Sequence, residues 1–404
     1  MAKYYLKCMD CGEEYQEESY SHFCSKCGIG FVEAEIEGAA KDRKVDLGRS
    51  SVYKYHEFMP FSINDAPEDV EDYGDIQEFR DEAISDKLDI EVIIKDETLM
   101  PTGTWKDREG FISLYRMYKN GVTDAVVFSS GNTGISLIRS ASLFKKTRLH
   151  LIVPKASQAR LAPLLREYDQ NYFSVMYFDG SNDECILTAK QFAKENNFPT
   201  EGGFENYARR EGLKLLGLEH IHSTYDYEKD VDFYVQPVAG GIGIYSWDKA
   251  YRDSGLEAPK ILGVQASICA PMVAAWEDKA ETLEGKHIPS SVVESDYVRV
   301  LRTRNPGDAY RIVSSVVRRV GGGFVSANDN EIHEAIRTFY LSDYFKNKFH
   351  KCGRLIGLEP ATALAGLLKA KQNGLVKAGD RVLLNVSGAA KSGDVKKDWI
   401  ADLL

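Results

Sequence analysis

The stretch EVIIKDETLMPTGTWKDREGFISLYRMYKNG, residues 91–121, contains the pattern on which the fold depends. Its first residues are β-branched and apolar, which is typical of a short buried strand. Its last part has apolar side chains at helical spacing: Phe111, Leu114, Tyr115 and Tyr118. Lys106 therefore lies at a strand-to-helix junction, where α/β proteins often place their chemistry. The alternative is a solvated surface lysine, so Lys106 needs partners elsewhere in the chain.

The size and charge of the chain narrow the class of protein. With 404 residues, 43% of them hydrophobic, it is long enough for two packed domains and a small extra module. No run of 18 apolar residues is present, and the first residues lack an apolar signal core, so we expect a cytoplasmic protein without a membrane partner. The net charge of −10, with both signs interspersed, argues against a nucleic-acid partner.

Four of the seven cysteines form two Cys-x-x-Cys pairs near the start of the chain: Cys8, Cys11, Cys24 and Cys27. Two such pairs are typical of a four-thiolate zinc site, with Gly12 and Gly28 giving each turn its freedom. We therefore expect a zinc-ribbon-like module over residues 1–33, with structural Zn²⁺. The alternative is a former ribbon that holds reduced thiols. The three lone cysteines are expected to carry no chemistry.

Downstream of residue 88, strand patterns alternate with helix patterns. The strand patterns are AVVFSSGNTG (125–134), LHLIVP (149–154), YFSVMYFDG (172–180), VDFYVQPVAGGIG (231–243), PKILGVQA (259–266) and GDRVLLNVSGAAKSGD (379–394). This alternation predicts parallel sheets covered by helices on both faces. Residues 34–88 have a charged and irregular pattern, and residues 271–328 have no pattern that identifies their elements.

Three loops that follow strands could each bind part of one cofactor. SSGNTG (129–134) opens a helix, whose first N–H groups bind anions such as a carboxylate. AGGIG (239–243) suits a phosphate, and it is a poor dinucleotide fingerprint because Ser246 takes the last glycine position. Ser387 directly follows a buried strand, where its hydroxyl can meet a ring nitrogen. Pyridoxal phosphate needs such parts: a lysine for its aldehyde, a phosphate cradle and a polar partner for its ring nitrogen.

Five ordered motifs resemble the threonine synthase-like family of fold type II pyridoxal-phosphate enzymes, which includes threonine synthase and cysteate synthase. PTGTWKDREG is similar to that family's Pro-Thr-Gly-Ser/Ala-Phe-Lys-Asp-Arg-Gly, and SSGNTG to its Ser/Thr-Gly-Asn-Thr loop. NYARREG, GLEPATALAGLL and VSGAAK resemble three further family motifs. The resemblance implies an α/β fold of two doubly wound domains with mostly parallel sheets plus the ribbon. It places the large domain at 34–105 and 206–404 and the small domain at 106–205, in a homodimer.

The resemblance also implies roles for single residues. Lys106 falls on the catalytic lysine that forms the Schiff base. The cofactor is expected to contact Asn132 at the ring hydroxyl, Ser387 at the ring nitrogen and Glu359 near the ring face. The AGGIG loop differs from the family's Asn-Ala-Gly-Asn type, but its place before a helix still predicts contacts with the cofactor phosphate from Gly240, Gly241, Ile242, Gly243 and Ile244. The substrate is expected to contact Ser129, Ser130, Asn132, Thr133 and Arg209. Arg209 is the first candidate for a substrate phosphate because arginine binds phosphate in a bidentate way, with Arg160 and Lys155 as weaker candidates.

The motifs also depart from the family pattern. Glu109 interrupts Asp-Arg-Gly, Trp105 replaces phenylalanine, and RTRNPGD (302–308) differs from the threonine synthase pattern. EGGFENYARREG resembles cysteate synthase instead. We expect a lyase that converts phosphohomoserine and water to threonine and phosphate. The alternative is β-replacement on phosphoserine with sulfite. Two other classes remain: an inactive zinc-ribbon adaptor, and an NAD-dependent dehydrogenase, which lacks the fingerprint.

Overall fold

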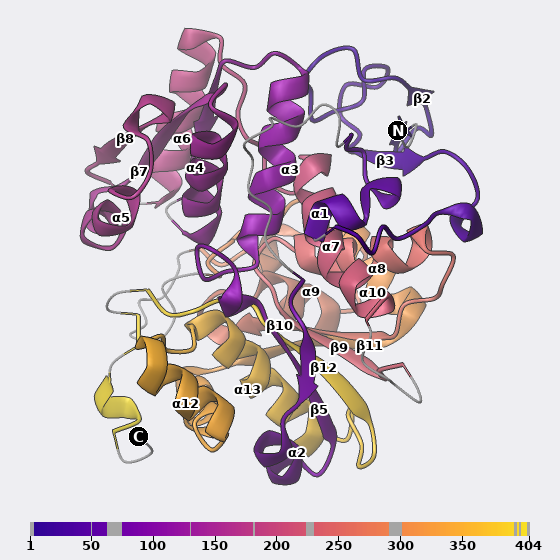
Figure 1. Ribbon diagram of the computed structural model, residues 1–404, viewed down its shortest axis with the longest axis vertical. Helices are drawn as coiled ribbons and strands as arrows, with labels where there is room; N and C mark the ends of the chain where they lie inside the picture. The colour runs from indigo at the N-terminus through magenta and orange to yellow at the C-terminus, as the bar shows by residue number, and fades with distance from the viewer. Residues whose placement is uncertain are drawn as a thin grey trace. The chain divides into compact units, whose positions relative to one another are not determined.

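The computed structural model describes residues 4–49, 51–62, 75–129, 131–180, 182–223, 230–290, 301–391, 394–395 and 397–401 (Figure 1). The chain divides into two compact units. Unit 1 comprises Met1–Asp75, Trp105–Glu219 and Asp253–Leu256, and unit 2 comprises Ile76–Thr104, His220–Arg252 and Glu257–Leu404. Residues 34–75 and 206–219 belong to the same compact unit as Lys106.

Unit 2 is built on a six-stranded sheet with the order β11-β10-β9-β12-β5-β4. Its strands are β4 (Glu78–Arg80), β5 (Glu91–Asp96), β9 (Phe233–Pro237), β10 (Lys260–Ala266), β11 (Gly322–Ala327) and β12 (Arg381–Val386). All neighbouring pairs are parallel except β4 and β5. The four inner strands read as near-continuous apolar runs, which is expected when both faces of a parallel sheet are buried.

Helices cover both faces of this sheet. The helices of unit 2 are α2 (Glu82–Leu88), α8 (Ile242–Asp253), α9 (Pro271–Glu277), α10 (Ala309–Val320), α11 (Asp329–Phe339), α12 (Asp343–Cys352) and α13 (Leu358–Gln372). Val264 of β10 faces Gly366 of α13, whereas its neighbour Gly263 faces Ile244 of α8. Because side chains alternate across a strand, these contacts place α13 and α8 on opposite faces. A large apolar core fills the space around α11, α13 and the sheet.

Unit 1 contains a smaller parallel sheet with the order β6-β7-β8. The strands are β6 (Asp124–Val127), β7 (Arg148–Pro154) and β8 (Phe173–Phe178). The helices are α1 (Ser51–Lys54), α3 (Lys106–Lys119), α4 (Asn132–Phe144), α5 (Gln158–Leu165), α6 (Asn182–Asn196) and most of α7 (Tyr207–Ile221). Leu151 lies against α4, and Ile152 packs with Ala189 and Ala193 of α6 on the other face. The predicted α/β class with mostly parallel sheets is confirmed.

The N-terminal segment forms a third, antiparallel sheet with the order β2-β1-β3. Its strands are β1 (Tyr4–Cys8), β2 (Glu14–Tyr15) and β3 (Val32–Ile36). Gly12 and Gly28 have φ angles of 72° and 77°, so each turn after a cysteine pair uses the left-handed backbone that glycine adopts easily. Among the described residues, no helix is long and apolar enough to cross a membrane.

Two segments contain more regular structure than the sequence pattern indicated. The part expected to be irregular, 34–88, includes α1, β4 and α2, while residues 63–74 lie outside the described residues. The unassigned part, 271–328, contributes α9, α10 and the edge strand β11. β11 begins with the sequence Gly-Gly, and Gly322 has a φ angle of 109°. Glycine weakens the apolar pattern of a strand, so the sequence did not predict β11.

Candidate active site

Lys106 is the first residue of α3, and its side chain is 20% exposed. The ammonium Nζ lies 3.2 Å from Oε2 of Glu109 and 4.7 Å from the centre of the Trp105 ring. Burial lowers the pKa of Lys106, and the Glu109 carboxylate acts in the opposite direction. A lysine with a lowered pKa and a partly exposed side chain can act as a nucleophile or a base.

Two glycines let α4 and α7 approach α3 closely at the turn that carries this lysine. A Cβ atom on Gly110 would lie 2.8 Å from the carbonyl oxygen of Ser136 in α4. A Cβ atom on Gly212 would lie 2.3 Å from the carbonyl oxygen of Arg108. Neither position has room for a larger residue. The two motif glycines therefore allow α3 to pack closely against α4 and α7 near the start of each helix.

A buried ion pair further ties α3 to α7. Arg108 donates to both carboxylate oxygens of Glu219, at 2.5 and 2.8 Å, and both side chains are almost fully buried. The bidentate geometry is that of a strong, specific arginine–carboxylate pair. Arg108 thus stabilises the packing of α3 on α7. Because Glu219 already engages its guanidinium, we do not assign Arg108 to an anion.

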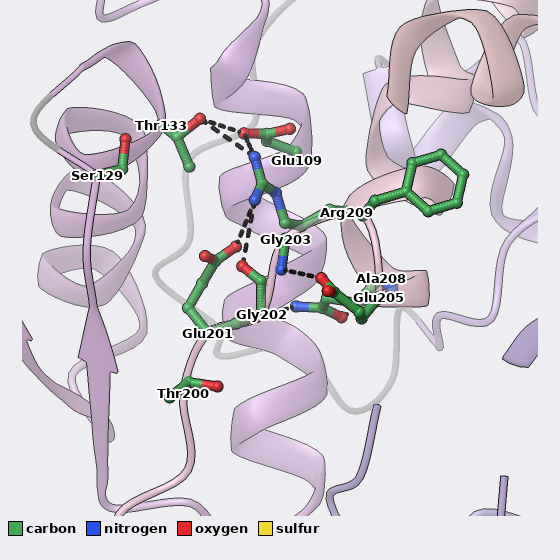
Figure 2. A network of polar contacts seen from close by, with 12 residues as sticks. Glu109, Ser129, Thr133, Thr200, Glu201, Gly202, Gly203, Glu205, Ala208 and Arg209 are labelled. Atoms are coloured by element: carbon green, nitrogen blue, oxygen red, sulfur yellow. Dashed lines mark hydrogen bonds and ion pairs between the residues drawn. The ribbon is translucent and has the colours of Figure 1, made fainter. Parts of the chain in front are cut away.

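Glu109 contacts Thr133 and Arg209 at one end of the polar network that Figure 2 shows. Its side chain has 0% exposure. Its Oε1 accepts hydrogen bonds from Thr133 Oγ1 at 2.7 Å and from Arg209 Nη2 at 2.8 Å, and Oε2 accepts from Lys106. Burial acts to raise the pKa of Glu109, but the charges of Arg209 and Lys106 outweigh it and hold this pKa below its usual value. Glu109 is therefore a carboxylate at neutral pH.

Arg209, in the first turn of α7, lies between Glu109 and Glu201, as Figure 2 shows. Its Nη1 is 3.1 Å from Oε1 of Glu201 and donates to the carbonyl oxygen of Gly202 at 3.3 Å. Burial acts against the charged guanidinium, but the two carboxylates outweigh it and raise the pKa of Arg209. Burial also raises the pKa of Glu201 to about 8, against the attraction of Arg209.

The loop that carries Glu201 rests on the N-terminal module. His22 Nε2 donates to the carbonyl oxygen of Thr200 at 2.9 Å. Gly202 has a φ angle of 79°, and a Cβ atom there would lie 2.7 Å from His22 Nε2. The ring of Phe31 lies 5.8 Å from that of Phe204. The loop conformation therefore requires glycine at position 202 and depends on contacts with the cysteine-containing module.

The other substrate positions expected from the sequence lie around the start of α4. Asn132 is the first residue of this helix, and Thr133 is the buried second residue. Ser129 is half-buried just after β6, and its Oγ accepts from the N–H of Gly131 at 3.4 Å. Ser130 lies outside the described residues. Lys155 is exposed and Arg160 is half-buried.

The predicted phosphate loop lies in unit 2, between β9 and α8. Gly241 has a φ angle of 86°, and a Cβ atom there would lie 2.7 Å from Val313 Cγ2. At Gly240 a Cβ atom would meet nothing within 4 Å. Ile242, Gly243 and Ile244 form the first turn of α8, whose N–H groups have no acceptor within the helix. Open backbone amides at a helix start favour an anion.

Ser387 and Glu359 also lie in unit 2. Ser387 directly follows β12 and is buried, and its carbonyl oxygen accepts from Thr104 Oγ1 at 3.1 Å. Glu359 is in the first turn of α13. A Cβ atom on Gly357 would lie 2.6 Å from the carbonyl oxygen of Gly388. The start of α13 and the end of β12 are therefore in close backbone contact.

The four cysteines of the N-terminal module converge. Their sulfur atoms all lie within 4.8 Å of one another. The Sγ atoms of Cys8 and Cys27 are 3.8 Å apart, and those of Cys11 and Cys24 are 3.7 Å apart. Gly30 gives this cluster its room, because a Cβ atom there would lie 2.4 Å from the sulfur of Cys8.

Two residues of the network, Glu109 and Glu201, have no role in the sequence interpretation. Glu109 carried one usable signal, because it lies three positions after Lys106 and i, i+3 positions share a helix face. Glu201 carried none, since its contact with Arg209 depends on the loop that precedes α7.

Comparisons with known proteins agree with this architecture. Residues 73–388 match the family described as "Pyridoxal-phosphate dependent enzyme". Threonine synthase of Methanosarcina acetivorans is 26% identical over 95% of this chain and 91% of its own length. Cysteate synthase of Methanococcoides burtonii is 26% identical over 97% of this chain and 90% of its own length.

Solved structures show the same fold at lower identity. Maize serine racemase aligns with a TM-score of 0.63 and 17% identity over 81% of this chain and 92% of its own. The processed form of threonine deaminase isoform 2 from Solanum lycopersicum aligns with a TM-score of 0.62 and 17% identity, over 80% and 81% of the two chains.

Proposed function

The chain belongs to the family of pyridoxal-phosphate dependent enzymes, and from this premise we propose that it acts on a phosphorylated amino acid by elimination and replacement. The preferred reaction is threonine synthase-like: O-phospho-L-homoserine and water give L-threonine and phosphate. The observation that carries this proposal is the convergence of Lys106, Thr133 and the arginine Arg209 on one buried network. Similarity to threonine synthase over nearly the full length supports it.

The residues present fit pyridoxal phosphate. Gly240 leaves open the space that a side chain would fill, and the first turn of α8 offers backbone N–H groups to a phosphate. We assign the cofactor phosphate to Gly240, Gly241, Ile242, Gly243 and Ile244. Lys106 would hold the aldehyde, with Asn132, Ser387 and Glu359 around the ring. When bound, the cofactor supplies an electron sink for negative charge on the α-carbon of the substrate.

Lys106 would also move the proton of the substrate α-carbon. Burial lowers its pKa, so the neutral amine that can accept a proton is less costly to form than in water. Glu109, 3.2 Å away, would hold the charged form once the proton has arrived. The hydrogen bond between Glu109 and Lys106 would keep Nζ oriented before and after it accepts the proton.

The substrate acids would be bound by groups of unit 1. Thr133 and Ser129, with Ser130 and Asn132, are assigned to the α-carboxylate because they flank the start of α4. Arg209 is assigned to the phosphate. Its Nε is buried and has no hydrogen-bond partner among the described residues, so the guanidinium retains a donor for an incoming anion.

The alternative is cysteate synthase-like β-replacement, in which O-phospho-L-serine and sulfite give L-cysteate and phosphate. Its specific support is the EGGFENYARREG stretch and similarity to cysteate synthase over 97% of this chain. The two substrates differ by one methylene group. One methylene is worth only about 1–3 kcal/mol in a pocket, so residue types do not separate the two reactions.

Zinc is proposed at the four N-terminal cysteines. A tetrahedral Zn²⁺ with Zn–S distances of about 2.3 Å places its sulfur ligands about 3.8 Å apart. The Cys8–Cys27 and Cys11–Cys24 sulfur distances, 3.8 and 3.7 Å, fit this geometry. A closed four-thiolate site leaves no position for substrate, so this zinc would act in folding.

A product assay separates the two reactions. The purified holoenzyme is incubated with phosphohomoserine in one reaction and with phosphoserine plus sulfite in another, and phosphate and amino-acid products are measured. We expect threonine from the first reaction, whereas cysteate from the second would establish the alternative. Phosphate release from neither would contradict the phosphorylated substrate, and lack of visible cofactor absorbance would favour the inactive adaptor. Sedimentation analysis tests the proposed homodimer.

A further inference from the structure

The buried carboxylate of Glu109 is the shared acceptor of three donors that the proposed function assigns to cofactor and substrate. Thr133 Oγ1 and Arg209 Nη2 both donate to its Oε1, at 2.7 and 2.8 Å. Thr133 Oγ1 and Arg209 Nη2 are also only 3.3 Å apart. An oxygen within reach of both groups is where an acidic oxygen of a ligand would bind. In this chain Glu109 Oε1 occupies that position.

The neighbouring ion pair between Arg108 of α3 and Glu219 of α7 shows what a structural ion pair looks like here. Glu219 takes Arg108 in a bidentate pair, with both carboxylate oxygens on one guanidinium. Glu109 instead divides its two oxygens among three side chains from α3, α4 and α7. Arg209 does not depend on Glu109 for its position, since Glu201 and the Gly202 carbonyl also hold its Nη1. These contacts thus hold the Arg209 side chain in place without Glu109.

The negative charge of Glu109 affects how an anion can bind to Arg209. The charges of Arg209 and Lys106 hold the pKa of Glu109 below its usual value, so Glu109 is charged at neutral pH. Glu109 also contributes more than Glu201 does to raising the pKa of Arg209. An acidic ligand group that approaches Arg209 meets a carboxylate of the same sign already in contact with it. Binding requires this carboxylate to be displaced or to share its donors.

We propose that Glu109 is a specificity-determining residue, an internal anion that competes with the acidic group of the substrate for Arg209 and Thr133. The proposal rests on the assignment of Arg209 to the substrate phosphate. A tethered competitor has a high effective concentration, so it lowers the affinity of every anion at this position. Only a ligand that gains enough from its other contacts then binds, which is specificity by a built-in repulsive element.

The test measures binding of inorganic phosphate to the holoenzyme by calorimetry, at one pH and ionic strength. The cofactor fills its own phosphate loop, so the added phosphate reports on the second anion position. For Glu109→Gln we expect phosphate to bind about tenfold more tightly or better, because one buried charge of the same sign is removed. In the double variant Glu109→Gln/Arg209→Gln the gain should be lost.

Two further variants serve as controls for this experiment. Glu205→Gln is the matched control. Glu205 lies on the loop that carries Glu201, and its carboxylate accepts a hydrogen bond from the Gly203 N–H. We expect this variant to change the phosphate affinity less than twofold. Glu109→Asp keeps the charge but has a shorter reach, so it should bind phosphate with an affinity between those of wild type and Glu109→Gln. It serves as the test if Glu109→Gln does not fold.

The result that overturns the proposal is a phosphate affinity in Glu109→Gln, or in Glu109→Asp if only that variant folds, no higher than in wild type. A gain that persists in the double variant would also overturn it, since Arg209 would then not be the group for which Glu109 competes. Failure of the proposed function is a separate outcome. It would appear as no turnover of either phosphorylated substrate by wild type, whatever the phosphate affinities.

A spectroscopic readout distinguishes this role from a structural one. The pH titration of the visible cofactor band reports on the group attached at Lys106. Because Glu109 favours the protonated form of that nitrogen, Glu109→Gln should shift the midpoint to lower pH, and Glu205→Gln should leave it in place. An unmoved midpoint in Glu109→Gln would contradict the contact between Glu109 and the reacting lysine.

Discussion

At the scale of single residues, the chemistry depends on how burial and neighbouring charges set protonation. Lys106, Glu109, Glu201 and Arg209 lie in one network, yet their pKa values move in different directions. The pKa of Lys106 falls because burial dominates, and that of Glu109 falls because two cations face it. Neighbouring groups with divergent pKa values are typical of active sites.

Replacement of Lys106 tests the assignment of the catalytic residue. Lys106→Ala should remove the visible absorbance of lysine-linked cofactor and lower turnover by at least about 10³-fold, since both attachment and proton transfer are lost. The melting temperature should change little, because Glu109 keeps its contacts with Thr133 and Arg209. Lys190→Ala, at an exposed lysine of α6, is the control and should behave as wild type. A cofactor adduct that borohydride still traps in Lys106→Ala would refute the assignment.

Glu201 predicts a pH dependence of stability. Its folded pKa of about 8 is above the usual value for an unfolded glutamate, so the folded chain holds a proton that the unfolded chain releases. Its contribution to stability is therefore present at acid pH and is lost as the pH rises from about 4.5 through 8. Glu201→Gln should flatten the fall of the melting temperature across this window. An unchanged slope in the variant would show that Glu201 ionises normally.

At the scale of elements, the site depends on the close packing of α3 against α4 and α7. The glycines of two motifs, Gly110 and Gly212, face backbone atoms of the neighbouring helices. Their importance lies in the absence of a side chain. By controlling how closely the helices pack, these two glycines position Lys106 relative to Arg209.

Gly212→Ala should destabilise the protein strongly. The added Cβ would lie 2.3 Å from the Arg108 carbonyl oxygen and 2.7 Å from the Glu109 Cα, and neither backbone atom can move without shifting α3. We expect a loss of about 1–3 kcal/mol or more in unfolding free energy, as for other overpacked cores. Gly285→Ala is the control, because a Cβ there would meet nothing within 4 Å. Equal denaturant midpoints for the two variants would contradict the packing argument.

The cysteine-containing module supports the loop that carries Glu201, so metal content should affect both. We expect about one zinc per chain. The double variant Cys8→Ser/Cys11→Ser should lose the metal and lower the melting temperature, because binding of structural zinc contributes to folding. The control Cys185→Ser/Cys352→Ser removes two cysteines outside the cluster and should keep the zinc. Metal-free wild type of normal stability would contradict the proposed zinc site.

At the scale of the whole molecule, each unit has its own parallel sheet and its own core. The candidate residues are divided between them: the lysine and the substrate groups belong to unit 1, and the phosphate loop, Ser387 and Glu359 belong to unit 2. Unit 2 also contains a buried ionic cluster that the proposed chemistry does not use. In it, Glu78 contacts both His220 and Lys95.

This cluster predicts that overall stability falls at alkaline pH. Burial acts to lower the pKa of His220, but Glu78 and Asp230 outweigh it and raise this pKa to about 9. The stabilisation is thus complete below about pH 6.5 and is lost as the pH rises through 9. The loss should be on the order of 1–3 kcal/mol, and His220→Gln should remove most of the slope between pH 6.5 and 9. A wild-type melting temperature that is flat across this window would contradict the prediction.

Local patterns were sufficient to predict the parts of the molecule that depend on neighbours in sequence. The apolar runs at β5, β9, β10 and β12 are long enough to identify buried parallel strands, and the fold class follows from their alternation with helices. The four cysteines were predicted to converge for the same reason, since each pair spans one turn. The Gly-Gly start of β11 and the short β4 gave too weak a pattern to be found.

Other features were decided only by tertiary structure. Glu109 and Arg209 are 100 residues apart, and their contact exists because Gly110 and Gly212 allow α3, α4 and α7 to meet at one turn. The sequence by itself determined the pyridoxal-phosphate family and the mostly parallel α/β architecture, and it located Lys106 at a strand-to-helix junction, since short-range motifs and spacing encode these features. Only the fold decided that the arginine expected to bind a substrate phosphate is already paired with a carboxylate of the chain. Burial and charge at that position come from three helices that no local pattern brings together.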